Sequence, residues 1–141
     1  IRKLSRELVS PGLRERDLVP CICQLLDDTR MASGLDIHFT HELDPDILTD
    51  GKKVTMFRIL QEQLKNILKH SGANRVDISL HQEDKQVRMT VKDNGKGFDA
   101  NQTFRGIGLS GIFERIRYYE GTADIDTAVG KGCLLTVTIP L

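Results

Sequence analysis

The sequence of 141 residues has little of several features that would point to particular functions. It contains no Trp, only three Cys and four Pro, and its 20 Lys and Arg are balanced by 20 Asp and Glu. A net charge of zero without a Lys/Arg run argues against a domain that binds nucleic acid through a basic face. No apolar stretch approaches the ~20 residues of a membrane span, and no signal peptide is present. We therefore expect a cytoplasmic chain with no nucleic-acid partner and no direct membrane contact.

The few cysteines suggest neither a disulfide framework nor a zinc site. Cys21 and Cys23 stand two apart on a stretch expected to be helical, so they point to different faces, and Cys133 lies far away in an expected strand. Reduced thiols in a cytosolic domain are the simpler interpretation. With 39% hydrophobic residues, a chain of this length can form one core without covalent cross-links.

The spacing of the apolar residues divides the chain into two parts. Residues 1–12 have the pattern of a helix tail and linker that stop at a Pro-Gly pair, and residues 13–141 have the pattern of one domain. Because the sequence begins at Ile1 without Met, we expect a fragment of a longer protein, in which an upstream membrane anchor is compatible with everything seen here.

Within the domain, the periodicity predicts helices alternating with strands. Helices are expected over 15–32, over 53–70, and after residue 108, where Leu109, Ile112, Phe113 and Ile116 share a side. Strands are expected over 35–43, 76–80, 87–93 and 133–139. This order predicts an α+β fold: a two-layer sandwich of a mainly antiparallel sheet with helices on one face.

The helix predicted over 53–70 has two faces of different chemistry. At about 100° per residue, its apolar residues fall on one side, namely Phe57, Leu60, Leu64, Ile67 and Leu68. The polar residues that gather on the opposite side are Glu62, Asn66, Lys69 and His70. A solvated face is one interpretation. A binding face is the other, because an Asn oxygen suits Mg²⁺ while Lys and His suit phosphate oxygens.

A carboxylate ends the strand predicted over 87–93. Asp93 has the same parity as the apolar residues before it, so it is expected to point toward the core, where it needs partners. The following Asn94-Gly95-Lys96-Gly97-Phe98 is either a surface hairpin turn or a loop that lets a ligand approach the backbone. An acidic acceptor in an apolar slot would suit an exocyclic amine such as that of adenine.

A second glycine-rich stretch, residues 106–111, fits the pattern G-x-G-x-x-G. A polar loop precedes it where a dinucleotide-binding βαβ unit requires a strand, which excludes the Rossmann interpretation. A glycine-rich loop that opens a helix still presents backbone N–H groups to an anion such as phosphate, although the glycines can also be a hinge. No Walker A sequence is present, so a P-loop ATPase is excluded.

These three motifs predict a nucleotide pocket, and their order and spacing resemble the GHKL ATPases. The N box of that superfamily corresponds to Gln61-Glu62, Asn66 and Lys69-His70, the D-x-G-x-G box to 93–97, and the second glycine box to Gly106-Ile107-Gly108-Leu109. Within the superfamily, the chain looks most similar to sensor histidine kinases of the nitrate-sensor and membrane-fluidity-sensor type. The resemblance covers about residues 13–141, and residues 1–12 look like the end of a dimerisation-domain helix.

The resemblance implies the GHKL (Bergerat) ATP-binding fold with a mixed sheet, and ATP and Mg²⁺ as cofactors. It implies that Asn66 ligates Mg²⁺ and that Asp93 binds the adenine N6 amine. Glu62 matches the acid that acts on the nucleophile in hydrolysing relatives, and it is a catalytic candidate here with Asn66 and Lys69. Lys69 and His70 are implied to face the phosphates.

The resemblance also implies a lid over the site, and the sequence departs from the family pattern at one position. Gly95, Gly97, Gly106 and Gly108 would bracket a lid from Phe98 to Arg105, with Arg105 able to reach an anion and Leu109 closing the second glycine box. Cys133 stands where many relatives have Thr, whose hydroxyl supports the adenine-binding Asp through a water. Because a thiol is a poorer hydrogen-bonding group, altered adenine binding is expected.

The resemblance implies a protein histidine kinase that transfers the γ-phosphate of ATP to a histidine on its own upstream dimerisation domain. The phosphate would then pass to a response regulator receiver domain, and the full-length protein would be a homodimer. Two alternatives stay open: a nucleotide-gated interaction module without phosphotransfer, and an anti-sigma-type serine kinase. His41-Glu42 has the form of a phosphoacceptor, but it closes a predicted strand, so we expect the acceptor to lie upstream of this chain.

Overall fold

The computed structural model describes residues 17–97 and 109–141. Its helices are α2 (Leu18–Ser33), α3 (Asp50–Asn66), which continues into a π-helical turn η1 (Ile67–Ser71), and α5 (Leu109–Tyr118). Its strands are β1 (Asp36–Glu42), β2 (Arg75–Glu83), β3 (Gln86–Asp93), β4 (Thr122–Thr127) and β5 (Cys133–Pro140). Residues 1–12, predicted to be a helix tail and linker, lie outside the described residues.

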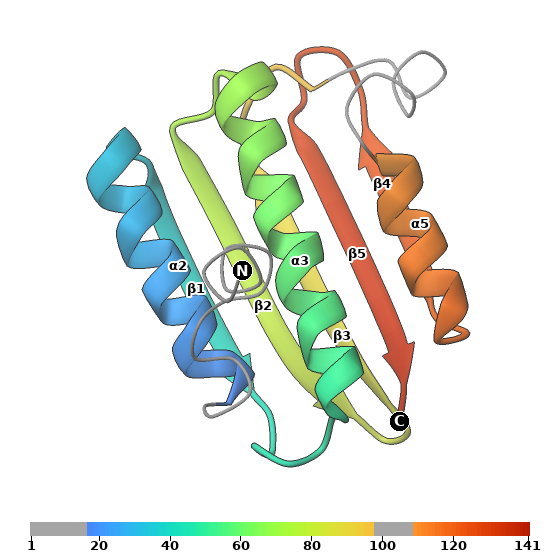
Figure 1. Ribbon diagram of the computed structural model, residues 1–141. Helices are drawn as coiled ribbons and strands as arrows, with labels where there is room; N and C mark the ends of the chain where they lie inside the picture. Colours follow the sequence, from blue (N-terminus) through green and yellow to red (C-terminus); the bar gives the residue numbers. More distant parts are fainter. Residues whose placement is uncertain (1–16, 98–108) are drawn as a thin grey trace, which may run out of the picture.

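The strands form one sheet in the order β1-β2-β3-β5-β4. β1 and β2 are parallel, because α3 crosses over between them, and the other neighbouring pairs are antiparallel. Helices α2, α3 and α5 lie side by side on one face of this sheet (Figure 1). The predicted fold class is therefore confirmed: a two-layer α+β sandwich with a mixed, mainly antiparallel sheet.

Strand alternation builds the core and aims one carboxylate into it. Every second residue of β2, β3 and β5 faces the helices and is almost completely buried, and these are Val76, Ile78, Leu80, Val87, Met89, Val91, Leu135, Val137 and Ile139. Asp93 continues the β3 series and is also buried, at 3% exposure. The position of this acid thus follows from the two-residue period of a strand, as predicted.

Two helices end at glycines in the way that the sequence predicts. Gly34 follows α2 with φ +72°, and Gly72 follows η1 with φ +65°. In this left-handed conformation a glycine meets no Cβ penalty, so it can terminate a helix and turn the chain. The turn at Gly72 leads from η1 into β2 and lies beside the site described below.

Two features of the fold differ from prediction. β4 was not expected, because its apolar residues Ala123 and Ile125 are only half-buried at the sheet edge and give a weak alternating pattern. Leu68 was assigned to the apolar face but is 49% exposed. It lies in η1, and since a π turn holds more residues than an α turn, Leu68 is rotated away from the buried stripe.

Among the helices in the described part of the chain, none combines the length and apolarity needed to cross a membrane.

Candidate functional site

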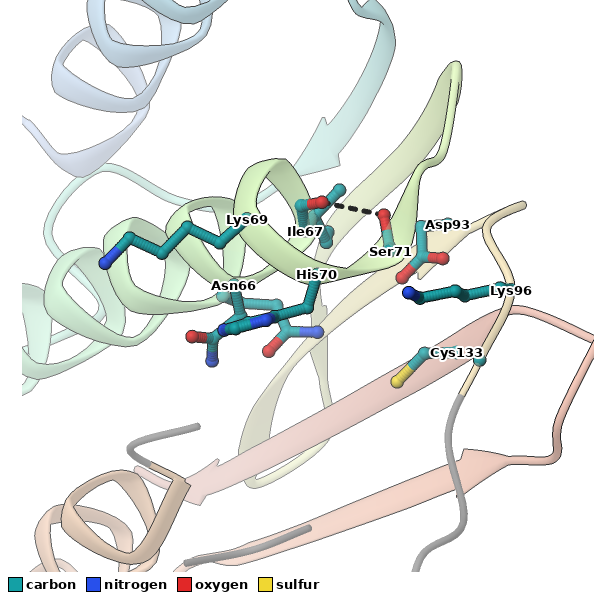
Figure 2. Close-up of a pocket in the computed structure, with 10 residues that line it drawn as sticks. Asn66, Ile67, Lys69, His70, Ser71, Asp93, Lys96 and Cys133 are labelled. Atoms are coloured by element: carbon teal, nitrogen blue, oxygen red, sulfur yellow. Dashed lines mark hydrogen bonds between the residues drawn. The ribbon is translucent and has the colours of Figure 1, made fainter. Parts of the chain in front are cut away.

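A cavity of about 280 Å³ lies between the C-terminal end of α3 with η1 and the sheet, where β3 ends and β5 begins. Figure 2 shows side chains from the helix and from the strands approaching it from different sides. Its described lining consists of Gln63, Asn66, Ile67, Lys69, His70, Ser71, Asp93, Lys96, Gly97 and Cys133. Two of the three predicted motifs, those on 53–70 and on 93–97, therefore meet here. The third, at 106–111, begins outside the described residues.

Asp93 is the acidic group of the cavity. The backbone N–H of Gly95 donates a hydrogen bond to its Oδ1 at 2.8 Å. Burial raises the pKa of this carboxyl above its ordinary value of 3.8, and the Gly95 hydrogen bond opposes that shift. A carboxylate offers about four acceptor positions, so this single N–H leaves Asp93 free to accept further hydrogen bonds from a ligand.

The raised pKa of Asp93 makes the stability of the fold depend on pH in a defined direction. The unfolded chain loses this proton near pH 3.8, whereas the native state keeps it to a higher pH. The free energy of unfolding therefore falls as the pH rises from 3.8 through the raised pKa of the native state. Asp93→Asn keeps an acceptor for Gly95 but removes the titration. Urea unfolding at several pH values measures the free energy of unfolding of both proteins. As the pH rises from below 3.8, we expect this free energy to fall in wild type relative to Asp93→Asn, and the difference to become constant at higher pH. A difference independent of pH would contradict this.

The glycines after Asp93 are required by contacts within the protein. A Cβ on Gly95 would come within 2.4 Å of the Ser71 carbonyl oxygen, and the Lys96 N–H donates to that same oxygen at 2.8 Å. Gly97 has φ +64°, and a Cβ there would lie 2.1 Å from the Ala128 carbonyl oxygen. The prediction that these glycines permit unusual backbone geometry is confirmed at Gly97. The close approach that the structure shows is by the protein's own backbone.

Cys133 lies directly opposite Asp93 in the β3–β5 register. Burial, followed by the nearby Asp93 charge, raises the pKa of the thiol to about 11, although hydrogen bonds from the Thr127 and Gln63 side chains act in the opposite direction. The thiol is therefore uncharged at neutral pH. It adds a small, weakly polar surface beside the carboxylate.

The three cysteines are expected to differ sharply in reactivity. Cys23 is exposed, whereas Cys21 and Cys133 are buried, and only thiolates react well with alkylating agents. Brief treatment of the native protein with iodoacetamide at mildly alkaline pH should therefore modify Cys23 first. Peptide mass spectrometry locates the label, and urea-unfolded protein is the control in which all three react. Labelling of Cys133 as fast as Cys23 in native protein would contradict its burial.

The helix side of the cavity carries the polar residues predicted on 53–70, with one change of position. Lys69 and His70 are exposed and line the cavity, as predicted, and in Figure 2 Lys69 extends away from Asp93. Asn66 was placed on a face opposite the apolar residues, but it is only 9% exposed. It lies at the junction of α3 and η1, where the helix end covers the cavity. Glu62, one turn earlier, is half-buried and is not among the lining residues.

Two lining residues were not predicted from the sequence. Ser71 ends η1, where its hydroxyl donates to the Ile67 carbonyl at 2.8 Å and accepts from the Ala73 N–H at 3.0 Å. Gln63 is buried inside the apolar stripe of α3. The sequence did contain a signal for Gln63. It lies three residues before Asn66 and four before Ile67, so a polar residue stands at a position of the apolar stripe.

Buried polar atoms in this cavity are left without partners. Within the described residues, Oε1 of Gln63 and Nδ2 of Asn66 are inaccessible to solvent and make no hydrogen bond. Buried polar groups are normally satisfied, because leaving one unpaired costs free energy. Both atoms belong to residues that line the cavity, so a bound ligand can supply what the protein does not.

The remaining predicted residues cannot be located here. Phe98, Arg105, Gly106 and Gly108 lie outside the described residues. Leu109 is the first residue of α5, as the predicted helix start requires.

The cavity has a buried acceptor and exposed side chains that can bind an anion. Asp93 is buried between β3 and β5, whereas Lys69 and His70 are exposed at the helix end, and Lys69 extends away from Asp93 (Figure 2). Lys96 is also exposed and follows Asp93 by three residues. This arrangement suits an elongated ligand with a hydrogen-bond donor at one end and negative charge at the other. The class defined by the fold and the cavity is therefore an α+β sandwich that binds a nucleotide.

Comparison with known proteins identifies the family. The model of the histidine kinase-, DNA gyrase B- and HSP90-like ATPases matches residues 51–141, which is more than half of the chain. The chain belongs to this family of ATP-binding domains. The resemblance to sensor histidine kinases is thereby confirmed at the level of the domain.

Similar proteins carry histidine kinase names. The chain is 32% identical to the sensor histidine kinase LiaS of Bacillus subtilis over 142 residues, which cover 100% of this chain and 39% of LiaS. It is 30% identical to the histidine-protein kinase/phosphatase UhpB of Salmonella typhimurium, covering 99% of this chain and 28% of UhpB. The chain thus spans less than half the length of these relatives.

Solved structures show the same fold. The histidine kinase domain of the blue-light activated histidine kinase from Erythrobacter litoralis superposes with a TM-score of 0.72 at 15% identity, covering 89% of this chain and 61% of that one. The catalytic domain of histidine kinase ThkA superposes with a TM-score of 0.70 at 17% identity, covering 87% of this chain and 89% of that one.

Proposed function

We propose that this chain is the catalytic domain of a two-component sensor histidine kinase. It would bind Mg·ATP and transfer the γ-phosphoryl group to a histidine on a helical dimerisation domain upstream, for relay to a response regulator. The single observation that carries the proposal is the polarity of the cavity, with a buried acceptor at Asp93 and the exposed cationic side chain of Lys69, which extends away from it. The family membership and the names of the relatives support it.

The residues of the cavity fit Mg²⁺ as a partner of the nucleotide. No cluster of three or more His, Cys, Asp or Glu side chains that could hold a metal exists among the described residues. Asn66 offers a single carboxamide, whose oxygen would face Mg²⁺ and whose Nδ2 has no hydrogen-bond partner among the described residues. Mg²⁺ often takes few protein oxygens together with phosphates and water, which matches one carboxamide. When bound there, Mg²⁺ would neutralise charge on the phosphates.

The protein's own part in the reaction would be to position the nucleotide. Asp93 would hold the base, and Lys69, His70 and Lys96 would offset phosphate charge near the rim. In the transfer itself, the bond between the γ-phosphorus and the β–γ bridging oxygen breaks while a bond to an imidazole nitrogen forms, which releases ADP and the imidazole proton. Phosphoryl transfer needs orientation and charge stabilisation more than covalent groups on the enzyme. Glu62 keeps its predicted catalytic role as part of this proposal.

Asn66→Ala tests the metal-dependent part of the site. We expect it to weaken Mg·ATP binding at least about tenfold, through loss of the carboxamide ligand. Titration calorimetry with a non-hydrolysable ATP analogue, with and without Mg²⁺, measures the effect. Gln24→Ala is the matched control, since it removes an exposed carboxamide on α2 that bonds Asp28 and lies outside the cavity. Equal affinity of Asn66→Ala and wild type in the presence of Mg²⁺ would remove Asn66 from the site.

Transfer to histidine needs a second experiment. The chain extended by the native upstream helices should form acid-labile phosphohistidine from labelled ATP, and Asn66→Ala should abolish it. ATP binding without any phosphohistidine would favour the nucleotide-gated module, and phosphoserine on a partner protein would favour the anti-sigma-type kinase.

A further inference from the structure

One buried residue of the cavity has no role in the nucleotide site described so far. Gln63 is 4% exposed, lines the cavity, and has its Oε1 buried without a hydrogen-bond partner among the described residues. A glutamine of this kind is costly to the fold, because leucine would fill the same space without burying an unpaired acceptor. A ligand that donates a hydrogen bond to Oε1 would remove that cost.

The unpaired atom of Gln63 is its amide oxygen. Oε1 is buried and has no hydrogen-bond partner among the described residues, and Gln63 lines the cavity together with Cys133 and Asp93. Gln63 thus presents an acceptor to the cavity.

This acceptor lies next to the one provided by Asp93. Cys133 and Asp93 are paired directly across β5 and β3, and such residues have Cβ atoms about 4.5–5.5 Å apart. Gln63, Cys133 and Asp93 therefore form one continuous patch at the buried end of the cavity. The patch carries two side-chain acceptors separated by a weakly polar sulfur.

We propose that Gln63 is a specificity-determining residue for the nucleotide base, with Oε1 accepting a hydrogen bond from the exocyclic amine of adenine beside Asp93. The inference rests on the proposed binding of ATP at this site and specifies how the base is selected. An exocyclic amine has two N–H groups, so two acceptors can each take one. A 6-oxo purine would place a carbonyl oxygen against both acceptors and would be rejected. Gln63 thereby supplies hydrogen bonding that the Cys133 thiol provides only weakly.

Gln63→Leu and a purine that lacks the amine test this assignment together. Titration calorimetry compares Mg·ATP with the triphosphate of purine riboside, which has hydrogen in place of the 6-amino group. For Gln63→Leu we expect a loss of about 3- to 10-fold in affinity for Mg·ATP, the size of one hydrogen bond. The affinity for the analogue should stay unchanged. The melting temperature of the ligand-free variant should equal or exceed that of wild type, because the unpaired acceptor is gone.

Gln24→Leu is the matched control, because Gln24 is exposed on α2, where its side chain bonds Asp28 and lies outside the cavity. It should bind both nucleotides as wild type does. Three results for Gln63→Leu would overturn the role of Gln63. The first is an equal loss of affinity for ATP and the analogue, and the second is an unchanged affinity for ATP. The third is a lowered melting temperature together with reduced affinity for both nucleotides. If wild type binds neither nucleotide, the proposed function itself fails. If Asp93→Ala abolishes ATP binding while Gln63→Leu does not change it, the function stands and this inference falls.

Discussion

Replacing Asp93 with Ala should lower the affinity of the chain for ATP about 10- to 100-fold, because a hydrogen bond to a charged group is worth more than a neutral one. The carboxylate is buried, and the only partner that the structure gives it among the described residues is the Gly95 N–H. In Asp93→Ala, a ligand amine bound at this position would lose its hydrogen-bond acceptor, and a water molecule would not readily take the place of the buried carboxylate. Titration calorimetry with an ATP analogue measures the change.

Asp77→Ala is the appropriate control for this substitution. Asp77 lies on β2 opposite Lys92, on the sheet face away from the helices, where Arg75 pairs with it at 3.1 Å. Removal of an acid there should leave nucleotide affinity unchanged. If Asp93→Ala melts like wild type and still binds the analogue with wild-type affinity, Asp93 does not bind the ligand.

Gly132→Ala should destabilise the fold strongly and weaken nucleotide binding. Gly132 has φ +74°, and a Cβ there would lie 2.3 Å from the carbonyl oxygen of Asp93. The added methyl group would have to push apart β3 and β5 next to the cavity. Left-handed strain and the backbone clash together should cost about 2–5 kcal/mol in the free energy of unfolding, and nucleotide affinity should fall because Asp93 is displaced.

Gly130→Ala separates the clash from the backbone strain. Gly130 also has a positive φ, +81°, and a Cβ there meets nothing within 4 Å among the described residues. It should cost only about 1–2 kcal/mol, the penalty of a left-handed alanine, with nucleotide affinity retained. Urea unfolding of both variants gives the comparison. Equal destabilisation by the two substitutions would show that the close approach of Gly132 to Asp93 is unimportant.

The order of elements, the fold class and the general place of the site were predictable from local pattern. Strand alternation placed Asp93 inside because side-chain direction in a strand depends only on parity. Gly34 and Gly72 ended helices because the left-handed turn after a helix favours glycine wherever the helix lies. Asn66, Lys69 and His70 line the same cavity, since residues three and four apart on a helix are neighbours.

Other features depended on contacts that no local pattern contains. β4 forms because β5 offers it a partner, although its own apolar residues bury little surface. The π turn at Ile67–Ser71 rotates Leu68 outward, and Asn66 is buried just before it. The prediction assumed a regular α-helix and was therefore wrong about the burial of both residues. Gln63 was not predicted as a site residue, and only the packing of α3 on the sheet places it in the wall of the cavity.

The sequence by itself determined which chemical groups the site contains and, through the motifs, the family to which the chain belongs. Tertiary structure decided which of these groups meet. Asp93 and Cys133 are 40 residues apart in the sequence but directly opposite in the sheet, and Gln63 lines the same cavity from helix α3. The physical reason is that periodicity governs the direction of each side chain within its own element, whereas strand register and helix packing set the distances between elements.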